Sequence, residues 1–479
     1  MKRNLFFILI FLFITFIYAE TKFEIKEFYG GSIDFSSTFY TDSFFGSRGD
    51  ALRNGGVVST LDFQQSFTSY NPATLAFQKK TTVSMSFIPF GFFGTGLVEG
   101  VLGKNINNEM KKMIDDKLED AFKDMTKTAG VETKINSFKG YIGQAPAIMG
   151  WEGMVPLAGG KTSFGIAREE KFTFETKLLL NGLESLVKIT DDSNPLLDMS
   201  ARIKTNLSLN IEIRNLVTSF GLGRQITDEW GIGAVLEKYD SKFYLNGQGM
   251  IDGVATVSGV TLEFNTNENN SLDQKAYAEL LSDAWGLRLG TSYHFLKDTL
   301  ELAADFSIQP EMKFNGSPEI IIHKLPDTID TSDFTKTKEE KPDTAGDLYM
   351  KLPSFMRITF AWKPGMILAL NYIHYFDPFY LKFENSKNNL KAYLDMMDSF
   401  RIGFNFGGYF QLGGGITLAR EGLKSIDKEK NETKEEVVWF PLPVLSTGFA
   451  FPIGDYIKTE VVLLALPMPV FKTSFTLNF

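Results

Sequence analysis

The carboxyl-terminal segment of this chain alternates between two kinds of side chain up to its last residue. The odd-numbered positions from 471 to 479 are mostly apolar, and the even-numbered positions between them are polar. Period-2 alternation is typical of a strand with two different faces. Many chains end in a frayed polar tail, so this ending indicates a terminal strand that belongs to a sheet. One face of that strand carries Phe471, Thr473, Phe475, Leu477 and Phe479.

The same alternation recurs along the chain, with one bulky apolar row and one small or polar row in each segment. The segments include 216–223, 285–295, 300–308, 356–362 and 400–406. A β-sandwich also alternates, but its apolar rows meet in one shared core. Aromatic rows that recur on strand after strand favour a membrane barrel, in which each strand spans the bilayer in ~9–11 residues. We therefore predict an all-β fold, a transmembrane antiparallel β-barrel of about 14 strands over residues 80–479.

The composition narrows the function classes. The chain has 479 residues, a net charge of -9, and a cysteine count of Cys 0, which excludes disulfides, thiolate metal sites and cysteine nucleophiles. An acidic balance argues against a nucleic-acid partner. The three histidines, His294, His323 and His374, show no metal-ligand spacing. We predict no catalytic residues, no metal site and no cofactor, and therefore no enzyme.

The amino terminus reads as a secretory signal peptide over residues 1–19. Lys2 and Arg3 precede an apolar run from Leu5 to Ile14, and Ile17-Tyr18-Ala19 is a plausible cleavage site. The alternative is an uncleaved amino-terminal anchor. After this segment, no apolar run is long enough to cross a bilayer as a helix, which needs ~20 residues.

Several insertions are predicted to extend from the barrel. Longer polar connections over 256–284, 310–351, 377–399 and 421–436 suit the outer side of a membrane. Weaker helical periodicity marks 178–189, 272–281 and 390–397, so we expect helical extracellular insertions.

The clearest helical signal lies in an insertion near 97–127. Apolar residues recur there at three- to four-residue spacing from Val98 to Met125. One interpretation is that this stripe packs on the barrel rim or on a neighbouring helix. The other is an adaptable landing site for an apolar ligand, since methionine side chains are flexible. Its residues would be Met110, Met113, Phe122 and Met125.

Residues 20–79 differ from the strands and are rich in Gly, Ser and Phe. They end at Asn71-Pro72-Ala73, where Pro72 lacks an N–H and pushes Asn71 away from helical geometry. This predicts a fixed corner, or simply a turn. The run Ala51–Ala76 resembles the amino-terminal hatch of the FadL/TodX family of outer-membrane transporters, which contains Asn-Pro-Ala before its first barrel strand. The Leu-Pro opening of Leu352–Ile358 also resembles that family, and Phe479 resembles the carboxyl-terminal assembly signal of outer-membrane barrels.

The resemblance implies a barrel in the bacterial outer membrane with residues 20–79 as a hatch inside its lumen. It implies passive uptake of long-chain fatty acids or other hydrophobic small molecules, with a shift of the hatch that opens a route sideways near the Asn71–Ala73 corner. The expected partners are this ligand, outer-membrane lipid and the barrel-assembly machinery, and the barrel is expected to be a monomer. Lumen arginines would pair with a ligand carboxylate or with lumen acids; the candidates are Arg288, Arg357 and Arg401.

Two other functions remain open at this point. The first is a general porin or a surface adhesin on a barrel scaffold, which would have a wide wet lumen or a large functional loop. The second is a barrel that anchors or assembles other envelope proteins.

Overall fold

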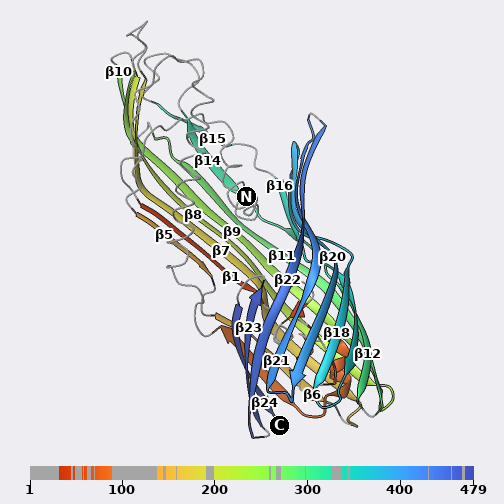
Figure 1. Ribbon diagram of the computed structural model, residues 1–479. Helices are drawn as coiled ribbons and strands as arrows, with labels where there is room; N and C mark the ends of the chain where they lie inside the picture. Colours follow the sequence, from red (N-terminus) through yellow and green to blue (C-terminus); the bar gives the residue numbers. More distant parts are fainter. Residues whose placement is uncertain are drawn as a thin grey trace.

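The structure is a computed structural model, and almost all of the chain that it describes is β-strand (Figure 1). The described residues are 32–41, 43–44, 47–48, 57, 59–61, 66–68, 71–88, 137–143, 147–157, 159–189, 199–257, 260–265, 271–296, 298–324, 336–341, 346–429, 431–454, 456–466 and 470–479. Within these residues, no helix has the length and apolar character needed to cross a bilayer.

Fourteen antiparallel strands form a closed barrel, which confirms the predicted fold class. Closure occurs where β24 pairs with β4, from Thr473↔Phe87 to Asn478↔Thr82. The terminal alternation seen in the sequence therefore builds the seam of the barrel. In wall order the strands are β4 (Thr82–Ile88), β6 (Ala147–Pro156), β7 (Thr162–Ile189), β8 (Met199–Gln225), β9 (Trp230–Val257), β11 (Gln274–Phe295), β12 (Leu300–Ile308), β17 (Phe355–Trp362), β18 (Ile367–Tyr375), β20 (Asn388–Phe406), β21 (Phe410–Asp427), β22 (Glu432–Ile453), β23 (Ile457–Leu466) and β24 (Val470–Asn478).

The two faces of the wall differ as the alternation predicts. In β17, Ile358, Phe360 and Trp362 point outward and are 41–48% exposed, whereas Arg357 and Ala361, which belong to the alternate row, are fully buried. Outward apolar side chains recur on the neighbouring strands. An apolar outer belt is the arrangement that a lipid bilayer requires of a barrel.

Several strands continue far beyond the belt. The strands β7, β8 and β9 have 28, 27 and 28 residues, which is more than twice the ~9–11 that span a bilayer. Short strands extend the same edge of the sheet, and the arms they form rise from the barrel in Figure 1. These strands are β10 (Val260–Phe264), β13 (Glu311–Phe314), β14 (Glu319–Lys324), β15 (Lys338–Glu340), β16 (Gly346–Lys351) and β19 (Phe379–Asn385).

The weaker helical predictions are wrong, because the three segments concerned lie in β7, β11 and β20. Their apolar residues meet apolar partners across the sheet, such as Leu178↔Leu209 and Leu280↔Phe243. Cross-strand contacts of this kind override local helical periodicity. Much of the four long insertions predicted as outer connections is also strand.

Other expectations fall outside the described residues. These are the signal peptide at 1–19 and the helical insertion near 97–127 with Met110, Met113, Phe122 and Met125.

The strand β1 (Ser32–Thr41) lies in the wall, although the sequence analysis placed residues 20–79 in the hatch. It pairs antiparallel with β7 over Phe172–Asn181 and parallel with β5 (Ser137–Gly143). β6 covers only the lower part of β7, up to the pair Gly150↔Glu169. β1 therefore supplies the ladder that the edge of β7 would otherwise lack. A two-residue pair, β2 (Ser43–Phe44) with β3 (Ser47–Arg48), follows it.

Candidate functional site: a hatch seated in the lumen

A buried segment fills the lower lumen, and we call its described residues the hatch: 57, 59–61, 66–68 and 71–77. Val57 and Leu61 pack against the wall residues Ala361, Ile367 and Ala369. A second apolar contact, on the side of β6–β9, joins Phe67 and Leu75 to Met154, Ala167 and Val235. The described part of the hatch thus contacts opposite sides of the barrel interior.

The predicted corner at Asn71 is the start of a short 3-10 helix, η2 (Pro72–Phe77). The Asn71 side-chain oxygen accepts a hydrogen bond from the Ala73 N–H at 2.9 Å. Its amide nitrogen donates to the main-chain carbonyls of Thr291 and Ala304, at 3.2 and 3.0 Å. These carbonyls belong to paired residues of β11 and β12. Asn71 therefore caps η2 and fastens it to two wall strands at once.

Glycines in the wall make room for this corner. A Cβ atom at Gly233 would lie 2.1 Å from the Pro72 carbonyl oxygen, and one at Gly290 would lie 1.9 Å from the Asn71 side-chain oxygen. Gly233 pairs directly with Gly290 on one side and with Gly223 on the other. We call these positions the glycine seat; its residues are Gly165, Gly221, Gly223, Gly231, Gly233 and Gly290. Only residues without a side chain allow the hatch to approach so closely.

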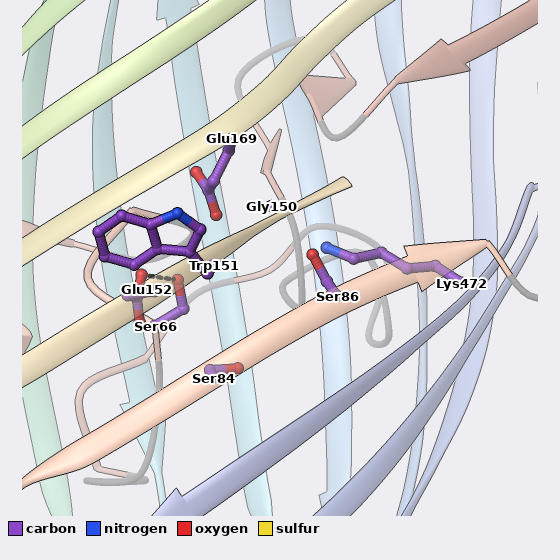
Figure 2. Close-up of a pocket in the computed structure, with 8 residues that line it drawn as sticks. All are labelled: Ser66, Ser84, Ser86, Gly150, Trp151, Glu152, Glu169 and Lys472. Carbon is purple, nitrogen blue, oxygen red and sulfur yellow. Dashed lines mark hydrogen bonds between the residues drawn. The ribbon is translucent and has the colours of Figure 1, made fainter. Parts of the chain in front are cut away.

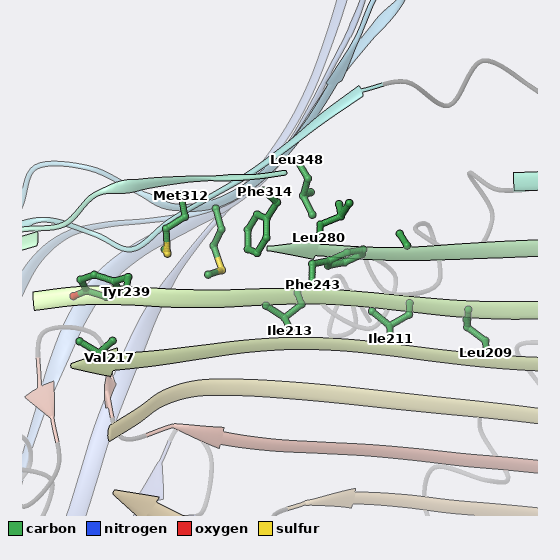
Figure 3. Close-up of a cluster of buried hydrophobic side chains, with 12 residues drawn as sticks. Leu209, Ile211, Ile213, Val217, Tyr239, Phe243, Leu280, Met312, Phe314 and Leu348 are labelled. Carbon is green, nitrogen blue, oxygen red and sulfur yellow. The ribbon is translucent and has the colours of Figure 1, made fainter. Parts of the chain in front are cut away.

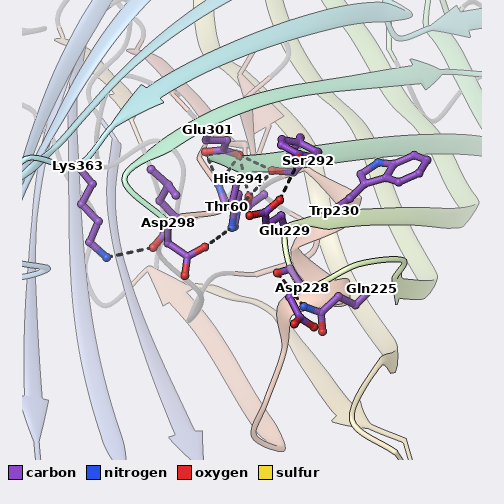
Figure 4. Close-up of polar contacts among 12 residues, drawn as sticks. Thr60, Gln225, Asp228, Glu229, Trp230, Ser292, His294, Asp298, Glu301 and Lys363 are labelled. Atoms are coloured by element: carbon purple, nitrogen blue, oxygen red, sulfur yellow. Dashed lines mark hydrogen bonds and ion pairs between the residues drawn. The ribbon is translucent and has the colours of Figure 1, made fainter. Parts of the chain in front are cut away.

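Buried carboxylates of the wall hold the hatch hydroxyls. Glu301 accepts hydrogen bonds from the Ser59 hydroxyl at 2.5 Å, the Thr60 hydroxyl at 2.7 Å and the Thr60 N–H at 2.9 Å. Ser292 donates to the same carboxylate, and His294 contacts the Thr60 hydroxyl at 2.8 Å (Figure 4). A buried carboxylate with this many donors satisfies most of its hydrogen-bonding capacity. We call this group the Glu301 clamp.

A second polar contact lies across the lumen, at β6 and β7. Glu152 accepts from the hydroxyls of Ser66 at 2.6 Å and Thr68 at 2.9 Å. Glu169 accepts from Thr68 at 3.0 Å and forms an ion pair with the buried Lys171. A small polar cavity opens beside these residues (Figure 2). Its lining is Ser66, Ser84, Ser86, Gly150, Trp151, Glu152, Glu169 and Lys472.

The wall is irregular at this same height. The register of β4 on β6 shifts between Ser86 and Phe87, and the register of β7 on β8 shifts between Glu170 and Phe172. Gly150 lies between these shifts with a φ of 154°. Such bulges bend a strand and interrupt its ladder. By contrast, β11 pairs with β12 and with β9 in unbroken register behind the Asn71 corner.

An apolar cluster lines the inner face of the arms beyond the hatch (Figure 3). It lies further along β8 and β9 than the glycine seat and reaches across to β13 and β16. We call it the upper cluster; its buried residues are Leu209, Ile211, Ile213, Val217, Tyr239, Phe243, Ala278, Leu280, Met312, Phe314, Leu348 and Met350. Half-buried residues such as Phe172, Leu178 and Phe379 pack against it.

The three predicted lumen arginines all point inward. Arg357 forms a two-point ion pair with Asp305, at 2.7 and 2.9 Å, which matches the interpretation that lumen arginines pair with lumen acids. Arg288 donates to the Thr68 carbonyl at 2.7 Å and therefore holds the hatch. Arg401 donates to the hydroxyls of Ser399 at 3.0 Å and Tyr375 at 3.3 Å.

The sequence analysis found the corner but missed the clamp and most of the seat. Asn71, Pro72 and Ala73 are all buried at the corner, where the motif predicted a fixed turn. The small inward row of β8 was visible in the sequence, including Gly221 and Gly223. Glu301 and Glu152 gave no signal, because an inward acid on an alternating strand looks like any polar lumen residue. Phe479 is exposed, and its backbone N–H donates to the Thr81 carbonyl at the barrel seam.

No protein-family model matches this sequence, and no curated protein matches it. Among solved structures, the chain is similar to FadL-type outer-membrane transporters. The toluene transporter TbuX of Ralstonia pickettii is 12% identical, with 91% of this chain and 99% of that chain covered and a TM-score of 0.43. The toluene transporter TodX of Pseudomonas putida is 11% identical, with 92% of this chain and 97% of that chain covered and a TM-score of 0.40. A Pseudomonas aeruginosa FadL homologue is 11% identical, with 92% of this chain and 98% of that chain covered and a TM-score of 0.41.

Proposed function

We propose that this protein is an outer-membrane channel for the passive uptake of long-chain fatty acids or other hydrophobic small molecules. The observation that carries the proposal is the upper cluster, a group of buried apolar side chains that extends along β8 and β9 above the hatch. A closed barrel with an apolar belt supports a location in a membrane. A buried lining of leucine, isoleucine, methionine and phenylalanine favours an apolar solute over a sugar.

Transport then follows a sequence of apolar surfaces. A hydrophobic molecule leaves water at the arms, enters between the side chains of the upper cluster, and reaches the hatch at Phe67 and Leu75. Each step keeps the apolar surface out of water, so the movement needs only a downhill concentration gradient. Methionines such as Met312 and Met350 are suited to this task because their side chains adapt to varied shapes.

Onward passage requires the hatch to move. We place the exit beside Ser66–Thr68, where the registers of β4 on β6 and of β7 on β8 shift, and not at the Asn71 corner. The ladders behind Asn71 are continuous, whereas the register shifts near Gly150 weaken the wall. A shift of Ser66 and Thr68 away from Glu152 would free this part of the lumen first.

The uptake experiment compares two neighbouring residues of β9 that point to opposite faces. Phe243 is buried in the upper cluster, and Tyr244 makes an edge-to-face ring contact with Tyr277 away from it. In proteoliposomes, Phe243→Ser should reduce uptake of a labelled long-chain fatty acid several-fold, and Tyr244→Ser should leave it unchanged. Equal uptake by both variants would contradict the apolar route.

The same vesicles test the porin alternative. A plugged lumen should give no osmotic swelling in solutions of small sugars, whereas a general porin admits sugars according to size alone. Swelling by the wild-type protein, together with fatty-acid uptake no faster than in empty vesicles, would overturn the proposal.

A further inference from the structure

One carboxylate interrupts the apolar inner side of the arm formed by β16 and β19–β22, which rises from the barrel in Figure 1. Phe379 of β19 pairs directly with Leu394 of β20. Glu421 of β21 pairs with Leu394 on one side and with Val438 of β22 on the other. We call these four residues the Glu421 row. Its carboxylate therefore has apolar neighbours on both adjacent strands.

Glu421 points to the inner side of this arm. The residue before it, Arg420, forms an ion pair with Asp395 and lies over the ring of Trp439, which is exposed on the outer side. Successive side chains of a strand point to opposite faces, so Glu421 lies on the face opposite to Arg420. Ala419, two residues away on the face of Glu421, is buried in an apolar cluster.

The Glu421 row continues the apolar surfaces already described. Phe379 packs against the upper cluster. Leu394 packs against a second buried group, which contains Met396 and Tyr375. A solute that lies on the apolar side chains of this arm therefore has the Glu421 carboxylate beside it.

The Glu421 side chain is half-buried and makes no polar contact. Among the residues that the structure describes, no hydrogen-bond donor and no cation lies within bonding distance of its carboxylate. The next charged residues on the same face of β22 are Glu436, two positions from Val438, and Lys434, four positions away. Partial burial of an unpaired carboxylate is unfavourable. Glu421 therefore stabilises no contact within the described chain, and this points to a partner from outside it.

The chemistry of the carboxylate identifies the kind of partner. An ionised carboxylate only accepts hydrogen bonds, so the polar group of a solute at this place must be a donor. An ammonium head is attracted by the charge, a hydroxyl head donates one hydrogen bond, and a carboxylate head is repelled. For two unit charges about 5 Å apart at a solvated site, the difference corresponds to roughly tenfold in affinity.

We propose that Glu421 is a specificity-determining residue, which favours apolar solutes with an amine head over alcohols, and alcohols over carboxylates. The ammonium group donates a charge-assisted hydrogen bond to Glu421, and the alkyl chain lies on Phe379, Leu394 and Val438. The inference rests on the proposed function and ranks the hydrophobic molecules that the arms accept. Fatty acids are then the least favoured of these three classes.

The test measures the affinity of the full-length protein, in a non-ionic detergent, for hexadecylamine, hexadecanol and hexadecanoate by native mass spectrometry. The wild type should bind hexadecylamine about tenfold more tightly than hexadecanoate, with hexadecanol between them. Glu421→Gln keeps the shape of the side chain and removes its charge, so it should bring the affinities for the amine and the carboxylate together. Glu421→Lys should reverse their order. Glu435→Gln is the matched control, because Glu435 of β22 faces outward and accepts a hydrogen bond from Tyr393 at 2.6 Å, and it should keep the wild-type order.

Two results would overturn the role of Glu421 alone. One is equal wild-type binding of the amine and the carboxylate, and the other is a Glu421→Gln variant that keeps the wild-type preference, in each case while Phe243→Ser weakens the binding of all three ligands. If Phe243→Ser left all three affinities unchanged, the proposed route would fail, and the inference with it. If Glu421→Gln lost the heat-modifiable migration of a folded barrel, Glu421→Leu, which matches the apolar neighbours of the row, would decide between the same outcomes.

Discussion

At the scale of single residues, the hatch is positioned by atoms that have almost no room to move. Gly233 and Gly290 allow main-chain contact with Pro72 and Asn71, and the Asn71 amide reaches the wall carbonyls of Thr291 and Ala304. Glycine removes steric bulk, and asparagine supplies both a donor and an acceptor. Substitutions at these positions should therefore disturb the position of the hatch more than the stability of the barrel.

Gly233→Ala should displace the hatch without opening the barrel. The added methyl group meets the Pro72 carbonyl at 2.1 Å, and overpacking of this kind costs about 1–3 kcal/mol. Hydrogen exchange of the amides in 71–78 should then accelerate by about tenfold or more. Gly249→Ala on the same strand is the control. A Cβ atom at Gly249 would lie 3.8 Å from the Leu207 side chain, which is an ordinary van der Waals distance. Equal exchange in the two variants would show that the seat does not hold the hatch.

Asn71→Asp should be at least as damaging as Asn71→Ala, although aspartate has the same shape as asparagine. Aspartate keeps the acceptor for the Ala73 N–H but turns the donor toward Thr291 and Ala304 into a second oxygen that faces two carbonyls. An unsatisfied buried polar group costs about 1–3 kcal/mol, and more when it is charged. Thermal unfolding of the detergent-solubilised barrel measures the effect. An aspartate variant as stable as the wild type would mean that the amide donor contributes nothing.

At the scale of elements, β1 is the least expected part of the wall. It lies between β5 and β7, and the buried Ser37 hydroxyl is 3.1 Å from that of Thr176. The amino-terminal segment therefore does two things: one strand completes the outer half of the wall, and the residues that follow fill the lumen. A substitution that disrupts the hydrogen bonds of β1 should therefore also destabilise the part of β7 that pairs with it.

Ser36→Pro should loosen the upper part of β7. Ser36 pairs with Tyr141 on one side and Lys177 on the other, and proline removes the N–H that a central strand needs. Loss of this hydrogen bond also leaves the partner carbonyl on the neighbouring strand without a donor, which costs about 1–3 kcal/mol of stability. Hydrogen exchange over Phe172–Asn181 should accelerate, while Ser32→Pro at the first position of β1 should have little effect. Unchanged exchange in Ser36→Pro would show that β1 is not needed by β7.

The sequence was most informative where a pattern was repeated and least informative where contacts were distant. Alternation in segments such as 356–362 predicted both the barrel and the direction of each face, because the period of a strand is fixed by its geometry. The Asn71–Ala73 motif predicted the corner because proline and asparagine restrict the local backbone. The Glu301 clamp joins residues 241 positions apart, so no local pattern reports it. Segments such as 178–189 misled because their partners lie on other strands.

At the scale of the whole molecule, the proposed transport depends on two parts, the barrel and the hatch, that are held in different ways. The barrel is held by backbone ladders between neighbouring strands, and the sheet closes on itself where β24 pairs with β4. The described residues of the hatch form no backbone pairing with the strands of the wall. Side-chain hydrogen bonds, contacts at the glycine seat and two small apolar clusters hold it in place. Hydrogen-bond clamps can be released without breaking the sheet, so we expect the hatch to be the part that moves during the proposed transport.

A disulfide between the hatch and the wall tests this motion directly. The hydroxyls of Thr60 and Ser292 are 2.7 Å apart, and the chain has Cys 0, so the double variant Thr60→Cys/Ser292→Cys contains a single possible bridge. Oxidation should lock the hatch against β11 and reduce fatty-acid uptake in proteoliposomes at least tenfold, and a reductant should restore it. The single variants should transport alike under both conditions. Full uptake by the oxidised protein, with the bridge verified by mass spectrometry, would mean that the ligand passes a stationary hatch, and the route beside Ser66–Thr68 would have to exist without any movement at Glu301.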